Sequence, residues 1–189
     1  MHAVLRKTFA LVCLAVLSAC TNYSDVDTLG PTVGELSKLP IETASTYISD
    51  KTIMTFNGPQ TVCPSGYMLG TVYVPVCHEV QGHGTQIEYF SPDGMAFLWY
   101  PGNRRAVPAR WKLVKGDASY AICFMYPKRS YNPLMKQSGG DWKCVSLGFW
   151  AREIVEVRSK DIFSLSTGKL PSRLHRYQTT FDDLLETNK

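Results

Sequence analysis

This sequence of 189 residues lacks the short motifs that identify several common protein classes. It has no Gly-x-Ser-x-Gly motif, so the nucleophile elbow of α/β-hydrolases is absent. It has no Cys-x-x-Cys pair, which argues against a structural zinc site. No internal repeat or low-complexity run occurs, and beyond residue 20 no apolar run approaches the ~20 residues that span a bilayer.

Strong charge is also lacking. The formal net charge is +4, and Arg6 and Lys7 supply two of the 20 basic residues. Without these two the balance is 18 basic against 16 acidic residues, which gives no argument for a nucleic-acid partner. The composition is ordinary for a globular protein, at 44% hydrophobic and 12% aromatic residues, and favours one domain with a sizeable core.

The N-terminal segment has the pattern of an export signal. Arg6 and Lys7 precede a run over residues 9–17 without a polar side chain. The run ends in Leu17-Ser18-Ala19-Cys20, which resembles a bacterial lipobox. The resemblance implies that residues 1–19 are removed and that Cys20 is acylated, with palmitate among the expected chains, and anchors the protein to a membrane. An ordinary cut after Ala19 remains the alternative.

The residue after the cysteine bears on location. Thr21 stands where an Asp would retain such a lipoprotein at the inner membrane, so we expect the outer membrane, facing the periplasm. Residues 20–40 are rich in polar and turn-forming residues, which predicts a flexible tether. Residues 41–189 are then expected to form a single disulfide-bonded β domain.

Four cysteines remain after removal of the signal and acylation of Cys20. An even number in an exported domain predicts two disulfides. Three pairings are possible, and we favour the local one because it closes two short loops between neighbouring strands: Cys63 with Cys77, and Cys123 with Cys144.

Alternating apolar and polar residues predict a mainly β fold. A short helix is expected at residues 41–50, and Ser91-Pro92-Asp93-Gly94 predicts a hairpin turn. Phe181, Leu184 and Leu185 follow Thr180 at helical spacing and predict a short C-terminal helix. We expect an antiparallel meander that forms a small barrel or a sandwich, preferably a nearly closed barrel with an interior filled by aromatic side chains. The other predicted strands cover residues 72–76, 87–90, 95–100, 110–113, 120–126, 142–145, 154–157 and 162–165.

Part of this pattern resembles a known family. The block Tyr89-Phe90-Ser91-Pro92-Asp93-Gly94, then Trp111, Ile122-Cys123-Phe124 and Trp142-Lys143-Cys144, resembles small exported proteobacterial proteins with a domain of unknown function. The resemblance implies export and disulfide bonding, and it implies no activity, substrate or cofactor.

Catalytic and metal-binding patterns are weak. His78 and His83 are five residues apart and cannot share one helical face, unlike the zinc-protease motif. His175 has no recognisable catalytic partner in the sequence. We therefore predict no catalytic residue, metal ligand or cofactor.

A basic, aromatic strip is the best candidate for binding. Residues 99–115 hold five basic residues and no acidic one. Arginine binds carboxylates and phosphates in pairs of hydrogen bonds, so Arg104, Arg105, Arg110 and Lys112 are candidates for an anionic partner. We also interpret the long loop 127–140, closed by the predicted Cys123–Cys144 bridge, as a recognition loop or a stapled insertion.

These patterns predict a non-enzymatic binding or structural module of the cell envelope. Its partner would be an envelope protein, peptidoglycan or an anionic glycan. The alternatives are a small-molecule carrier barrel, which needs a cavity, and an envelope hydrolase, which needs a nucleophile or a metal in a cleft.

Overall fold

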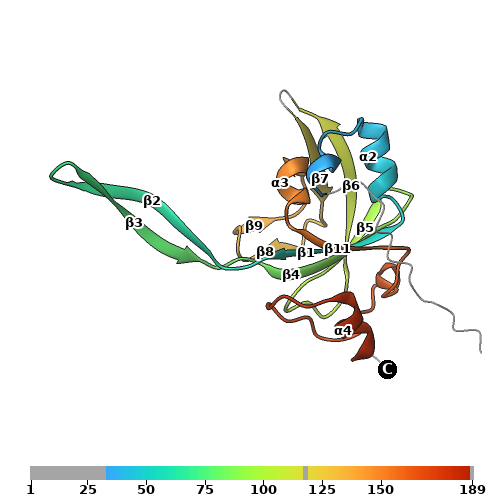
Figure 1. Cartoon of the computed structure of the whole chain (residues 1–189). Coiled ribbons are helices and arrows are strands. Elements are labelled where there is room, and N and C mark those ends of the chain that lie inside the picture. The colour runs from blue at the N-terminus through green and yellow to red at the C-terminus, as the bar shows by residue number, and fades with distance from the viewer. Residues whose placement is uncertain (1–32, 117–118, 188–189) are drawn as a thin grey trace, which may run out of the picture.

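The protein is built on one antiparallel sheet of seven strands, in the order β10-β7-β6-β5-β4-β1-β11 (Figure 1). The structure is a computed structural model that describes residues 33–116 and 119–187. The sheet strands are β1 (Lys51–Asn57), β4 (Gly84–Phe90), β5 (Met95–Trp99), β6 (Val107–Lys115), β7 (Tyr120–Met125), β10 (Lys143–Ser146) and β11 (Ile154–Ser159). Two hairpins stand apart from it, β2 (Gln60–Leu69) with β3 (Val72–Val80), and β8 (Tyr131–Asn132) with β9 (Gln137–Ser138). The short helices are α1 (Val33–Leu36), α2 (Ile41–Ile48), α3 (Leu147–Ala151), η1 (Leu165–Thr167) and α4 (Phe181–Glu186).

The sheet curls into a half-barrel, which confirms the mainly β, antiparallel prediction. The ring of Phe90 on β4 lies 5.3 Å from Trp111 on β6 and 6.1 Å from Phe124 on β7, centroid to centroid. Strands are about 4.8 Å apart, so β4 and β7 would be ~14 Å apart in a flat sheet. The curvature therefore creates a concave inner face. Helices α1, α2 and α3 cover part of it, and their core residues are Leu36, Ala44, Ile48, Leu147, Trp150 and Ala151 (Figure 1).

Within residues 33–116 and 119–187, no hydrogen-bonded pairing of strands closes the half-barrel. The two end strands, β10 and β11, each pair with only one neighbour in the sheet. Helix α3 links them directly in the chain. The sheet therefore closes through a short helical connection, in place of the nearly complete ring of strands that we expected.

The outer face of the sheet carries a second core. Trp99 packs edge-on against Phe163, at 5.4 Å, and Phe163 lies 5.7 Å from Phe181 of α4. The α4 helix starts at a capping box, in which Thr180 and Asp183 each accept a hydrogen bond from the other's backbone N–H, at 3.1 and 3.2 Å. The C-terminal segment therefore lies against the face opposite α1, α2 and α3 (Figure 1).

Hairpin β2–β3 projects away from this body (Figure 1). Neither core cluster of the described residues includes a side chain from β2 or β3. The two ends of the hairpin pass each other closely where it leaves the sheet. A Cβ at Gly82 would come within 2.1 Å of the carbonyl oxygen of Asn57. Only glycine allows this approach without a shift of the backbone.

Several local predictions are confirmed, one predicted strand is wrong and one boundary changes. The disulfides are Cys63–Cys77 and Cys123–Cys144, as favoured from the sequence. The predicted strand at residues 162–165 is wrong: the chain forms a turn and the 3-10 helix η1, because Asp161 accepts hydrogen bonds from the backbone N–H groups of Leu165 and Ser166.

The folded domain also begins earlier than residue 41. Leu36 is 1% exposed and belongs to the inner core, so residues 36–40 are part of the fold and not of a tether. The proposed signal, Cys20 and the first part of the expected tether lie outside the described residues. Within the described helices, none is long and apolar enough to cross a membrane.

Candidate functional site

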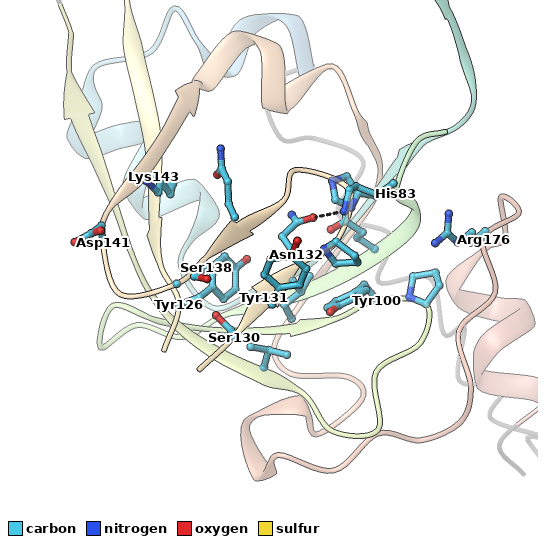
Figure 2. Close-up of a pocket in the computed structure, with 18 residues that line it drawn as sticks. His83, Tyr100, Tyr126, Ser130, Tyr131, Asn132, Ser138, Asp141, Lys143 and Arg176 are labelled. Carbon is cyan, nitrogen blue, oxygen red and sulfur yellow. Dashed lines mark hydrogen bonds between the residues drawn. The ribbon is translucent and has the colours of Figure 1, made fainter. Parts of the chain in front are cut away.

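The most distinctive site is a pocket of about 290 Å³ on the inner face of the half-barrel (Figure 2). Gln86, Leu98 and Val107 line it from strands β4, β5 and β6. Leu98 is paired with Val107, and the same face of the sheet carries Phe90 two rungs further along. The inner core therefore fills one end of the concave face, and the pocket occupies the other end.

The loop between β7 and β10 covers the pocket. Its fold is set locally: Asn132 Oδ1 accepts hydrogen bonds from the backbone N–H groups of Leu134 and Met135, both at 3.1 Å. The hydroxyl of Ser130 donates to the carbonyl of Pro127 at 2.7 Å. The Cys123–Cys144 disulfide joins the strands on either side of the loop. This is the loop 127–140 that the sequence marked for recognition, and the residues it contributes to the pocket wall are Ser130, Tyr131, Asn132, Pro133, Leu134, Gln137, Ser138 and Gly139.

A buried carboxyl lies beside the pocket wall. Glu88 is 8% exposed, is paired with Leu98, and accepts a hydrogen bond from the hydroxyl of Tyr126 at 3.3 Å. Burial raises the pKa of Glu88 to about 8, and the hydrogen bond from Tyr126 opposes this rise only in part. At pH 7 the carboxyl is therefore mainly protonated. Burial, followed by the nearby Glu88, raises the pKa of the Tyr126 hydroxyl well above its usual range.

Charged side chains mark the two ends of the pocket. Asp141 and Lys143 lie at one end, and His83 and Arg176 at the other (Figure 2). Burial, and secondarily the charge of Arg176, lowers the pKa of His83, so its ring is neutral at pH 7. The permanent charges are thus two cations and one carboxylate, around walls that carry three tyrosines, Tyr100, Tyr126 and Tyr131.

The basic residues predicted from the sequence lie elsewhere. Arg104 and Arg105 are exposed in the loop between β5 and β6. Arg110 and Lys112 are exposed on the outer face of β6, where they alternate with the inward-facing Ala109 and Trp111. None of these four cations lines the described pocket.

These cations do not all present free charge. The Lys112 Nζ lies 4.3 Å above the centre of the Trp142 ring. Arg110 borders a shallow depression on the outer face with Met95, Met125 and Lys128. The structure therefore divides the predicted strip between a loop and a strand face.

The histidines considered from the sequence are also separated. His78 is exposed on β3 of the projecting hairpin, His83 lines the pocket, and His175 stacks on Tyr177 with ring centres 5.1 Å apart. Among residues 33–116 and 119–187, no group of three or more His, Cys, Asp or Glu side chains could hold a metal ion.

The covering loop was predictable from the sequence, whereas the pocket was not. The position of Glu88 was predictable, because it lies two residues before Phe90 in a predicted strand. Residues two apart in a strand point to the same face, so Glu88 faces inward with an apolar residue. No family model, curated protein or solved structure matches this chain.

Proposed function

We propose that this chain is a lipid-anchored protein of the bacterial cell envelope that binds a small ligand and carries out no catalysis. The pocket on the inner face is the observation that supports ligand binding, and the segment Leu17-Ser18-Ala19-Cys20 is the one that supports the anchor. Its volume of about 290 Å³ lies near the lower limit of small-molecule sites, which are lined by apolar and aromatic side chains with a few placed polar groups.

The wall chemistry favours a compact ligand with a flat apolar body and an anionic end. Leu98, Val107 and Leu134 supply apolar surface, and the tyrosine rings supply flat walls with a polar edge. Lys143 and Arg176 lie where an anionic group of the ligand would meet a cation. Asp141 lies at the same end as Lys143 and offsets part of its charge, whereas Arg176 at the other end has no carboxylate among the residues that line the pocket.

The binding test uses anilinonaphthalenesulfonate, a flat aromatic anion whose fluorescence rises in apolar sites. We expect the purified protein to bind it, and Val107→Trp to abolish the signal by filling the pocket. Lys143→Ala with Arg176→Ala should weaken binding by about tenfold, since a hydrogen bond to a charged group contributes ~1.5 kcal/mol or more.

The matched control removes two cations from the outer face, Arg110→Ala with Lys112→Ala, and should leave binding unchanged. The opposite result, in which this pair weakens binding and Val107→Trp does not, would reject the pocket. It would favour the anionic-partner strip of Arg104, Arg105, Arg110 and Lys112 and the glycan or peptidoglycan partners that it suggests.

The anchor has its own test. Wild-type cells should incorporate labelled palmitate into the protein and retain it in the outer-membrane fraction, whereas Cys20→Ala should do neither. Incorporation that persists in Cys20→Ala would exclude this cysteine as the lipidation site.

A further inference from the structure

The projecting hairpin carries a second surface that the pocket does not explain. Residues 58–77 contain no Asp, Glu, Lys or Arg over 20 consecutive positions. Five apolar or aromatic side chains at its tip are 55–68% exposed: Tyr67, Met68, Leu69, Val72 and Tyr73. Soluble surfaces seldom expose such a cluster unless it binds something.

The register places these side chains in rows on both faces of the hairpin. Leu69 is opposite Val72 next to the turn, Met68 is opposite Tyr73 in the next row, and Tyr67 follows in the third. Successive residues of a strand point to opposite faces, so both faces of the tip are apolar. A partner protein would commonly cover one face, whereas lipid surrounds a tip on every side.

We infer that the tip of the β2–β3 hairpin inserts into the boundary between headgroups and acyl chains of a lipid bilayer. The order of residues fits this depth. Leu69 and Val72 lie next to the turn and would insert deepest, and Tyr67 and Tyr73 lie further from the turn, at the headgroup level where tyrosine is enriched in membrane proteins. The outward backbone groups of a two-stranded hairpin have no partners, and burying them in hydrocarbon is costly. Insertion is therefore shallow, about 5–10 Å, as for other interfacial segments.

The reach of the chain is compatible with this contact. The inference rests on the proposed lipid anchor only to bring the domain to a bilayer. The 13 residue steps from Cys20 to Val33 span at most ~47 Å. The ten residues of β2 extend ~33 Å at the rise of a strand. An anchored domain can therefore bring the tip to the surface of the same membrane.

The test is independent of the anchor. It uses residues 21–189, which cannot be acylated at Cys20 and which retain every buried core residue, from Leu36 to Leu184, and both disulfides. Flotation with neutral phosphatidylcholine vesicles should carry this chain upward, and 0.5 M salt, of the order that screens charges beyond a few Å, should not release it. Near-ultraviolet circular dichroism checks that each variant is folded.

The tip variant combines Leu69→Glu with Val72→Lys. These opposed positions keep the net charge and place an ion pair across the turn, so the hairpin itself is retained. Binding should weaken at least ~tenfold, because two apolar side chains no longer leave water. The matched control, Met135→Glu with Val155→Lys, introduces the same charges at exposed apolar sites outside the hairpin and should bind like the wild type.

Three results would overturn the inference. The first is absence of binding to neutral vesicles, or binding only to anionic vesicles that salt reverses. The second is equal loss in the tip and control variants. The third is self-association in sedimentation that the tip variant abolishes while vesicles bind neither form, which would make a second copy of this chain the occupant. Failure of the pocket to bind its probe, or of Cys20 to be acylated, would change none of these readings.

Discussion

Two hairpins of this protein have similar apolar content and opposite environments. Hairpin β4–β5 lies between β1 and β6 and buries most of β4. Hairpin β2–β3 pairs with no other strand in the described part of the chain and is exposed along most of its length. Apolar composition therefore does not determine burial in this chain. Burial follows from pairing on both edges and from the helices and loops that cover each face of the sheet.

The largest contrast should come from truncating one large apolar side chain in each hairpin. Trp99 is fully buried in the outer core, so Trp99→Ala should lower the free energy of unfolding by about 3–5 kcal/mol. Leu69 is 68% exposed, so Leu69→Ala should change it by no more than ~0.5 kcal/mol. Urea denaturation followed by tryptophan fluorescence measures both, and comparable losses would mean that the projecting hairpin packs onto the body in solution.

The two disulfides should differ next. Cys123–Cys144 closes a 21-residue separation within the sheet, and its replacement by two alanines should cost about 3 kcal/mol. Cys63–Cys77 lies within the projecting hairpin, so its replacement should leave the cooperative unfolding of the body within ~0.5 kcal/mol. The midpoints of thermal unfolding provide the measurement. A large loss for Cys63 and Cys77 would show that hairpin and body unfold as one unit.

The smallest effect concerns pH and Glu88 in the buried hairpin. The native carboxyl holds its proton up to about pH 8, whereas the unfolded chain releases it near 4.5. The native state binds more protons between these values, so this group makes stability fall as pH rises, by at most ~1.4 kcal/mol per pH unit.

Glu88→Gln should remove that slope. Unfolding free energies at pH 6 and pH 7.5 in wild type and variant would measure it. Glu79→Gln, which removes a carboxylate from the exposed hairpin, is the matched control. A wild-type slope that persists in Glu88→Gln would assign the titration to another group.

Features with a local cause were predictable from the sequence. The turn at Pro92-Asp93-Gly94, the capping box at Thr180 and the two short disulfide loops each depend on residues close in the chain. The error at residues 162–165 has the same origin, because the short apolar segment Ile162-Phe163-Ser164-Leu165 resembles a strand. There the hydrogen bonds accepted by Asp161 determine the backbone instead.

Features that depend on contacts between distant strands were not predictable. Strand β2 is a local exception: Pro64 and Gly66 break the usual alternation, so β2 was not among the predicted strands although the favoured Cys63–Cys77 bridge was predicted. The pocket depends on the curvature of the sheet, which sets how much of the interior the aromatic side chains fill. We expected a filled interior, and side chains fill it at only one end. The proximity of Glu88 to Tyr126 likewise depends on strands β4 and β7, which are not neighbours.

The position of β1 between β4 and β11 has a consequence for how the chain reaches its native state. Strands β4 to β7 can pair through short connections as they are made, but Lys51 pairs with Ser159, 108 residues later. Closing so long a loop is slow, and until β11 is available one edge of β1 remains open to pairing with other chains. The last strand of the sheet thus covers an edge of the first, and a newly made chain completes the pairing of β1 only when β11 is available.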